Sequence, residues 1–243
     1  MELLVDLFTK QWLFLLISCA AAYLISSVNT SIIVTSIVLH KDIRNEGSGN
    51  AGFTNVLRSV GKGPAIITFI GDFLKGVISV LIPYFLTFGW DGIELQQERQ
   101  MLMYLAGLFA VVGHMFPLYY HFKGGKGVVT TASVMLMTDW RVLVIALVIF
   151  GVFFVLTKTI SKCSLVCAGT YPFVGSCLRL LDSSADFPTL APIANTSPVL
   201  IGFIFAVTFI IALMIIIKHK DNIRRILDGT EKKITPKRKE AKA

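Results

Sequence analysis

Apolar residues along the chain gather in long blocks, separated by short breaks that contain charged residues, glycine or proline. Each block has roughly the 17 to 25 residues that an α-helix needs to cross a bilayer. A membrane barrel would instead show alternation in short segments. The pattern predicts an all-α polytopic membrane bundle of about seven helices. We expect them near residues 12–39, 64–88, 101–120, 127–138, 142–157, 164–180 and 198–217.

Two of these blocks are irregular. The block 12–39 is longer than one crossing needs, and polar residues at 26–31 interrupt its second half. The block 127–138 is short for a crossing. We therefore expect a break in the first block and a fourth helix that is supported by its neighbours.

Composition supports a membrane protein. With 54% hydrophobic and 16% charged residues over 243 positions, and a mean hydropathy of +0.72, the chain has more apolar surface than one soluble core could hide. We expect a membrane-embedded domain over 1–231 and a basic cytoplasmic tail over 232–243. The cysteines at 19, 163, 167 and 177 lack zinc-site spacing and are interpreted as packing residues.

Basic residues gather in alternate connections. One side carries Lys41, Arg44, Arg58, Lys62, Lys123, Lys126, Lys158 and Lys162, together with the basic residues from Lys218 to Lys242; the other carries Lys10, Arg99, Arg141 and Arg179. The positive-inside rule then places the N-terminus outside and the C-terminus in the cytoplasm. This agreement between alternate loops favours an odd number of spans. The net charge of +8 lies beside spans and in the tail, so we expect membrane lipids and no nucleic acid as partners.

Four polar clusters fall on the predicted cytoplasmic side: 42–63, 113–127, 159–164 and 218–231. The first is rich in glycine, whose backbone N–H groups can approach an anion closely, and the second contains Lys123-Gly124-Gly125-Lys126. Taken singly, the clusters could also be a flexible capping loop, basic flanks of membrane helices or a lipid-facing helix. Their convergence predicts a cytoplasmic basin for a small phosphorylated molecule, beside a bundle that could take an acyl chain.

Two details stay open. On a helix continuing from the last span, Lys218, Asn222 and Arg225 would share one face. Asp72 and Lys75 lie three residues apart inside the second predicted span, where a structural ion pair is as plausible as a substrate contact.

The motifs closely resemble the PlsY family of bacterial membrane acyltransferases, which transfer an acyl group from acyl phosphate to glycerol 3-phosphate. The similar pieces are 47–55, 71–76, 113–117, 122–127 and 219–231, so that the resemblance covers nearly the whole chain from about residue 23. It implies a seven-span bundle in the bacterial inner membrane, a site that faces the cytoplasm, and no cofactor or metal.

The resemblance also implies roles for particular residues. It places catalytic roles at His114, Asn222 and Glu231. It places contacts to the two small-molecule substrates at Ser27, Arg44, Ser48, Asn50, Thr54, Asn55, Lys123, Gly124, Gly125, Lys126 and Ser161. The chain departs from the family pattern at Asn29, Phe53, Lys162, Cys163 and Lys220, which concerns local contacts and chain-length preference.

The implied reaction suits these residue types. Acyl phosphate is already activated, so an enzyme needs mainly to bring a hydroxyl to its carbonyl and to stabilise the developing charge. We therefore expect direct transfer without an acyl-enzyme. His114, Glu231 and a substrate phosphate oxygen stay open as the proton acceptor.

Other functions fit less well. A transporter for a phosphorylated anion would spread polar residues through the membrane depth and show paired halves, and a lipid-binding scaffold would not need these clusters. A soluble-type acyltransferase would need an aspartate five positions after a histidine, and a phosphatidyl transferase would need metal-binding aspartates at helical spacing. The sequence contains neither pattern.

Overall fold

Most of the described chain is α-helix, which confirms the predicted all-α class. The computed structural model describes residues 2–89, 93–181 and 196–234, and no strand occurs within these ranges. The α-helices are α1 (Glu2–Thr9), α2 (Trp12–Ser26), α3 (Thr30–Leu39), α4 (Phe53–Ser59), α5 (Lys62–Leu86), α6 (Ile93–Met115), α7 (Val128–Thr138), α8 (Trp140–Thr157), α9 (Ile160–Leu181), α10 (Pro198–Lys218) and α11 (Lys220–Leu227). Two short 3-10 helices, η1 (Ile43–Asn45) and η2 (Leu118–Tyr120), lie in loops.

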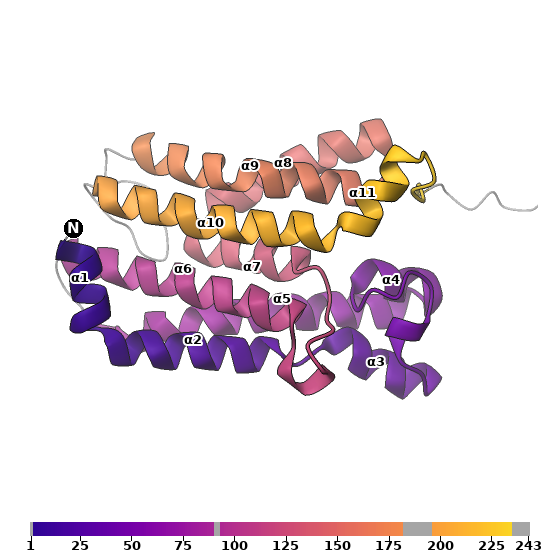
Figure 1. Ribbon diagram of the computed structural model, residues 1–243, viewed down its shortest axis with the longest axis horizontal. Helices are drawn as coiled ribbons and strands as arrows, with labels where there is room; N and C mark the ends of the chain where they lie inside the picture. The colour runs from indigo at the N-terminus through magenta and orange to yellow at the C-terminus, as the bar shows by residue number, and fades with distance from the viewer. Residues whose placement is uncertain (1, 90–92, 182–195, 235–243) are drawn as a thin grey trace, which may run out of the picture.

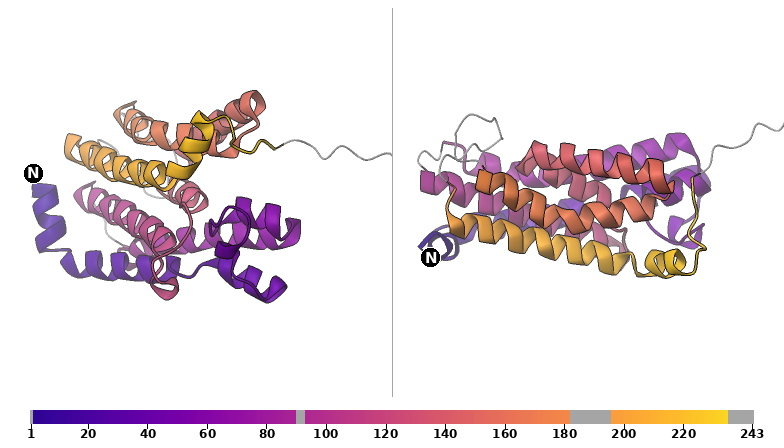
Figure 2. Two further views of the ribbon diagram at one scale, coloured as in Figure 1. Left: turned by 45° about the vertical axis from the view of Figure 1, so that its right-hand side comes forward. Right: turned by 90° about the horizontal axis from the view of Figure 1, so that it is seen from above.

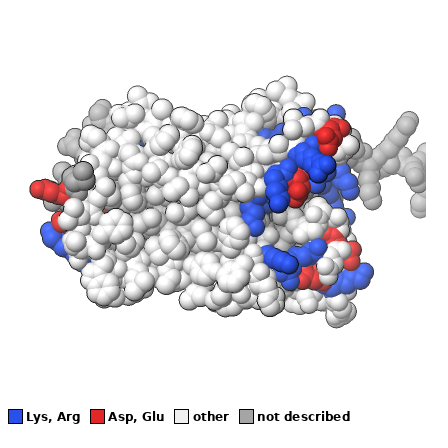
Figure 3. All heavy atoms as spheres, in the orientation of Figure 1, with Lys and Arg blue, Asp and Glu red and all other residues white. Residues whose placement is uncertain are grey.

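The long helices lie side by side along the long axis of the molecule (Figures 1 and 2). Within the described ranges, six helical segments are long and apolar enough to cross a membrane, and α7 is a shorter apolar helix of 11 residues. Charged side chains gather at the two ends, and the broad band between them is uncharged on the face shown in Figure 3. This distribution is that of a polytopic membrane bundle.

The core lies where α6, α7, α9 and α10 meet. Each contributes a buried side chain, represented by Leu102, Val134, Tyr171 and Ile211. The helix α8 differs, because Val142 is its one buried residue. It therefore presents most of its apolar side chains outward, as a lipid-facing helix does.

The predicted break in the first block is present between α2 and α3. Asn29 caps α3, since its side-chain oxygen accepts hydrogen bonds from the Ile32 N–H at 3.2 Å and the Ser31 hydroxyl at 2.7 Å. The Lys75 ammonium of α5 donates to the freed carbonyl of Val28 at 3.0 Å. The break is thus held by both a local cap and a neighbouring helix.

Some element boundaries differ from the prediction. The third span was expected to end near residue 120, but α6 ends at Met115, because Pro117 restricts the residue before it and cannot donate a helical hydrogen bond. The last span does not continue through 218–225: α10 ends at Lys218 and α11 begins at Lys220. An additional helix, α1, precedes the first predicted block and buries Leu7.

Candidate active site

The four polar clusters predicted to converge lie at one end of the bundle, opposite the end that carries α1 (Figure 1). This end includes α4, α11 and the loop from α6 to α7. The space-filling view shows lysine, arginine and acidic side chains concentrated there (Figure 3). Contacts between residues far apart in sequence join the clusters, as described below.

The glycine-rich segment 46–52 is a loop organised by Asn55 of α4. The Asn55 amide donates to the carbonyls of Ile43 at 3.2 Å and Glu46 at 2.9 Å, and its oxygen accepts from the Ser48 N–H at 2.9 Å. Gly47 has a φ of +60°, and a Cβ there would overlap the Asn55 side chain. Asn55 is buried. Its contacts are therefore structural, within a loop that leads into the α4 N-terminus.

Arg44 connects this first cluster to the loop after α6. Its guanidinium forms an ion pair with Asp42, at 2.6 Å between NH2 and Oδ2. It also donates to the carbonyls of Tyr120 at 2.9 Å and Lys123 at 3.3 Å. The hydrogen bonds from Arg44 lower the pKa of the Asp42 carboxyl, so this carboxylate is charged at neutral pH.

A polar cavity lies between these two loops. Its volume is about 590 Å³, and Asp42, Arg44, Asn45, Gly49, His121, Lys123 and Gly124 line it. Two cations and one carboxylate give this lining a net positive charge. Such a cavity suits a small anion with hydroxyl groups.

A second group of polar contacts, which we call the anion cluster, joins the α6–α7 loop, α9 and the C-terminal segment. Its members are Lys126, Ser161, Asn222, Arg225 and Glu231. The Lys126 ammonium donates to the Asn222 side-chain oxygen. Three donors converge on the Glu231 carboxylate: Ser161 at 2.5 Å, Asn222 at 2.7 Å and Arg225 at 2.7 Å.

Burial and contacts change the protonation of this cluster. Burial lowers the pKa of the Lys126 ammonium to about 8, although the charge of Glu231 opposes that shift. Burial alone would raise the pKa of Glu231, but the hydrogen bonds from its three donors outweigh this effect and hold it below its ordinary value. Burial, followed by the charge of Lys126, lowers the pKa of His219 to about 4. At neutral pH the cluster thus contains two cations, one carboxylate and a neutral imidazole nearby.

His114 lies beneath the Lys123–Lys126 loop. It is 3% exposed, and its Nδ1 is 3.7 Å from Asp72 Oδ1. A Cβ at Gly125 would overlap His114 Nε2 and the Ala51 carbonyl oxygen. The glycine at 125 is therefore required by close packing on His114. Asp72 in turn pairs with Lys75 at 2.9 Å, both buried inside the bundle.

The remaining predicted site residues occupy varied environments. Ser27 is buried, and its hydroxyl donates to the Tyr23 carbonyl at 2.8 Å. Asn50 and Thr54 are half-buried at the glycine loop and the start of α4, while Ser48 and Lys123 are exposed. Gly124 lines the polar cavity.

Two charged residues were not assigned to the site from sequence. Asp42 neutralises part of the Arg44 charge, and Arg225 pairs with Glu231 at 2.7 Å. Arg225 had been placed on a face shared with Lys218 and Asn222. Because the helix turns at His219, Lys218 instead donates to the Met115 carbonyl at 3.0 Å. A search for basic residues spaced around Glu231 could have pointed to Arg225.

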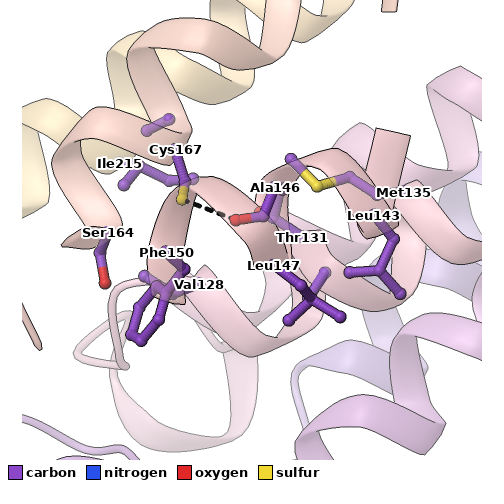
Figure 4. Close-up of a pocket in the computed structure, with 12 residues that line it drawn as sticks. Val128, Thr131, Met135, Leu143, Ala146, Leu147, Phe150, Ser164, Cys167 and Ile215 are labelled. Carbon is purple, nitrogen blue, oxygen red and sulfur yellow. Dashed lines mark hydrogen bonds between the residues drawn. The ribbon is translucent and has the colours of Figure 1, made fainter. Parts of the chain in front are cut away.

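An apolar pocket is lined by side chains from α7, α8, α9 and α10 (Figure 4). Its volume is about 70 Å³, and it is lined by Val128, Thr131, Ala132, Met135, Leu143, Ala146, Leu147, Phe150, Ser164, Cys167, Ala168 and Ile215. Two of the lining residues are close in sequence to members of the anion cluster. Val128 follows Lys126 by two residues, and Ser164 follows Ser161 by three, about 4.5 Å along α9 at 1.5 Å per residue.

Within the described residues, no group of three or more His, Cys, Asp or Glu side chains is placed to hold a metal ion. The site's polar groups are amides, hydroxyls, ammonium and guanidinium groups, with single carboxylates. These are groups that bind phosphate and carbonyl oxygens.

Both the sequence and the fold are similar to those of known proteins. A family model described as glycerol-3-phosphate acyltransferase matches residues 16–229. A glycerol-3-phosphate acyltransferase from Francisella tularensis subsp. mediasiatica is 36% identical over 222 residues, 90% of this chain and 92% of that protein. One from Clostridioides difficile is 34% identical over 223 residues, 92% of this chain and 97% of that protein.

Two solved structures have the same fold. Both are PlsY, an integral membrane glycerol 3-phosphate acyltransferase, and both are 28% identical to this chain and cover 91% of it. The glycerol 3-phosphate form is matched over 96% of its length with a TM-score of 0.72. The lysophosphatidic acid form is matched over 95% with a TM-score of 0.68.

Proposed function

Because the chain belongs to the glycerol-3-phosphate acyltransferase family, we propose that it transfers a fatty acyl group from acyl phosphate to the sn-1 hydroxyl of glycerol 3-phosphate. The products are 1-acylglycerol 3-phosphate, which is a lysophosphatidic acid, and phosphate. This is the first step of phospholipid synthesis. The chain is a membrane acyltransferase; the donor, the direct mechanism and the site assignment are our proposal.

The observation that carries the proposal is the position of the anion cluster directly beside an apolar pocket. An acyl phosphate has a dianionic head joined through a carbonyl to an alkyl chain, so its site must change from cationic to apolar within a few ångströms. Lys126 and Val128, two residues apart, lie on either side of such a change. A donor carried by a large soluble protein or nucleotide would need a further surface for that carrier.

We assign the donor phosphate to Lys126 and the start of α7. The N-cap of α7 is Gly127, which gives no side-chain hydrogen bond to the first turn. The first N–H groups of α7 are thus available to an anion, and the helix dipole favours negative charge there. Arg58 acts electrostatically on Lys126, so a second cation lies near the same position. The acyl chain then extends into the apolar pocket.

We assign glycerol 3-phosphate to the polar cavity, where Arg44 and Lys123 supply positive charge. Gly124, in the cavity wall, lies two residues before Lys126, and two residues of extended chain span at most about 7 Å. The two substrates can therefore lie next to each other. This adjacency is what a reaction in one step requires.

In the proposed reaction the sn-1 hydroxyl attacks the carbonyl carbon, a new ester C–O bond forms, and the bond from the carbonyl carbon to the phosphate oxygen breaks. The hydroxyl proton passes to the departing phosphate.

Two observations favour the departing phosphate over a side chain as the acceptor of this proton. Glu231 is engaged by three donors that hold its pKa low, which makes it a weak base, and His114 is covered by Gly125. We assign Glu231 and Asn222 to positioning Lys126, and His114 to supporting the loop.

We also propose that the site faces the cytoplasm of a bacterial inner membrane. The end of the bundle that carries the site carries the basic loops, and basic loops remain on the cytoplasmic side.

The proposal is tested by incubating the purified protein in detergent or lipid with palmitoyl phosphate and glycerol 3-phosphate. We expect lysophosphatidic acid and phosphate in equal amounts, measured by mass spectrometry and a phosphate assay. Parallel reactions with palmitoyl-coenzyme A and with palmitoyl-acyl carrier protein should give no product. Product from either of these donors, with none from palmitoyl phosphate, would refute the assigned donor.

A further inference from the structure

One hydroxyl in the apolar pocket has no partner. Of the two hydroxyl side chains in the pocket lining, Ser164 donates to the Ile160 carbonyl at 3.0 Å. Thr131, on α7, is 3% exposed, and its Oγ1 forms no hydrogen bond. Figure 4 shows both residues in the pocket wall. A buried hydroxyl without a partner costs about 1–3 kcal/mol, so its presence among apolar side chains needs a reason.

The other hydroxyl groups of α7 and α10 all donate to carbonyls, and Thr130 donates to the Asp72 carbonyl of α5 at 3.3 Å. Along α7, Ser133 donates to the Thr130 carbonyl at 2.7 Å and Thr138 to the Val134 carbonyl at 2.8 Å. On α10, Thr208 donates to the Ile204 carbonyl at 2.7 Å. These bonds within one helix are the usual way in which a membrane helix satisfies a hydroxyl. The Thr131 hydroxyl forms no such bond within its helix, although the Gly127 carbonyl lies four residues before Thr131.

The position of Thr131 relates it to the anion cluster. It follows Lys126 by five residues and Val128, which begins α7, by three. Three residues of helix correspond to about 4.5 Å. A ligand with its phosphate at Lys126 and its chain in the pocket would therefore carry the atoms next to the phosphate past Thr131. In an acyl phosphate those atoms are the carbonyl group.

We propose that the Thr131 hydroxyl donates a hydrogen bond to the carbonyl oxygen of the acyl donor, an inference that rests on the function proposed above. When the glycerol hydroxyl attacks the carbonyl carbon, negative charge develops on that oxygen. A fixed donor in a water-poor pocket stabilises this charge. Thr131 keeps its proton throughout, while the proton of the attacking hydroxyl leaves with phosphate.

The proposal makes stability and activity change in opposite directions. Thr131→Val removes the hydroxyl and keeps the branched shape. Because an unsatisfied buried group is removed, the Tm should stay equal or rise. The value of kcat/KM for palmitoyl phosphate should fall about tenfold or more, with KM for glycerol 3-phosphate unchanged. Thr131→Ser, which retains a hydroxyl, should keep most of the activity.

Thr208→Val is the matched control, because it removes a buried threonine hydroxyl that has a partner and lies outside the pocket. It should leave kcat/KM unchanged. Wild-type kinetics in Thr131→Val would overturn the proposal. A lower Tm in Thr131→Val that Thr131→Ser does not show would overturn it as well, because the hydroxyl would then act in folding.

A direct measurement separates this inference from the reaction itself. The probe is a palmitoyl phosphonate, in which a methylene group replaces the bridging oxygen, labelled with ¹³C at the carbonyl. In the wild-type protein, hydrogen bonding should shift the infrared carbonyl stretch of the bound probe to lower frequency, and Thr131→Val should abolish the shift. An identical spectrum in both proteins would overturn the inference even if lysophosphatidic acid is formed. Failure to form lysophosphatidic acid from palmitoyl phosphate, with the shift present, would refute the proposed reaction alone.

Discussion

At the scale of single residues, Lys126 links the two halves of the site. It donates to Asn222 across 96 positions of sequence, and it lies two residues before Val128, which begins α7 and lines the apolar pocket. Its position therefore depends on contacts with α11 and, through Asn222, on Glu231. A small change at this one side chain should alter substrate binding without altering the packing of the bundle.

Lys126→Ala should lower kcat/KM for palmitoyl phosphate about 10- to 100-fold, because a hydrogen bond to a charged group contributes about 1.5–3 kcal/mol. Lys233→Ala is the control, since Lys233 is exposed near the end of the described chain. It should be nearly silent in the same assay of purified protein. Equal activity of the two variants would remove Lys126 from phosphate binding.

The same residue predicts a pH dependence. The pKa of Lys126 is lowered to about 8 by burial, so the side chain is a cation below that pH and neutral above it. In the free enzyme, kcat/KM should therefore fall as pH rises through about 8. Lys126→Arg keeps its charge and should move this decline to higher pH. An unchanged alkaline decline in Lys126→Arg would show that another group causes it.

Gly125 gives a third prediction at this scale. In Gly125→Ala the new Cβ would overlap His114 Nε2 and the Ala51 carbonyl oxygen, and such overpacking costs about 1–3 kcal/mol. We expect a lower Tm and lost activity, measured on the same sample. Gly151→Ala is the matched control in α8, where a Cβ meets no atom within 4 Å. Similar behaviour of both variants would contradict the packing role of Gly125.

At the scale of elements, the interrupted helix α2–α3 depends on α5. Lys75 contacts both the Val28 carbonyl, at 3.0 Å, and Asp72, at 2.9 Å. Lys75 thereby connects the break between α2 and α3 to α5, whose Asp72 lies beside His114. The sequence predicted the break and left the Lys75–Asp72 pair open between structure and substrate binding. Its contacts favour a structural role.

Lys75→Met should destabilise the protein by about 3–5 kcal/mol, because it leaves Asp72 as an unpaired buried charge. Asp72→Asn in the same chain should recover part of this loss. The Tm values of the two single variants and the double variant form a thermodynamic cycle. Additive losses would show that the two side chains are not coupled.

At this scale the sequence predicts the helices, but it does not predict the contacts between side chains of different helices. The predicted blocks gave the ends of most membrane helices to within four residues, because a bilayer selects for long apolar segments. The exception is α6, which begins eight residues before the predicted 101 and ends five before the predicted 120. The pairing of Lys126 with Asn222 and of Ser161 with Glu231 across 70 positions had no signal in local pattern. The family resemblance named these residues, but their partners depend on how α9 and α11 pack. The turn at His219 was missed because no proline or glycine marks it.

At the scale of the whole molecule, the chain places α1 and α11 at opposite ends of the bundle (Figure 1). An odd number of crossings, which the alternation of basic loops predicts, would produce such an arrangement. The site shares its end with α11 and with most of the loop lysines and arginines. Substrates made in the cytoplasm would then reach the polar cavity from water, and the acyl product could leave sideways into the bilayer.

The orientation itself is a prediction that cysteine labelling can check. In a variant whose four native cysteines are replaced by alanine, we would introduce Thr9→Cys at the α1 end or Lys158→Cys at the site end. Both positions are exposed. With the positive-inside rule, a membrane-impermeant maleimide should label Thr9→Cys in cells with a permeable outer layer and an intact inner membrane. It should label Lys158→Cys only after the inner membrane is opened. The reverse result would place the anion cluster outside the cytoplasm, where neither acyl phosphate nor glycerol 3-phosphate is made, and the proposed function would then lack a route to its substrates.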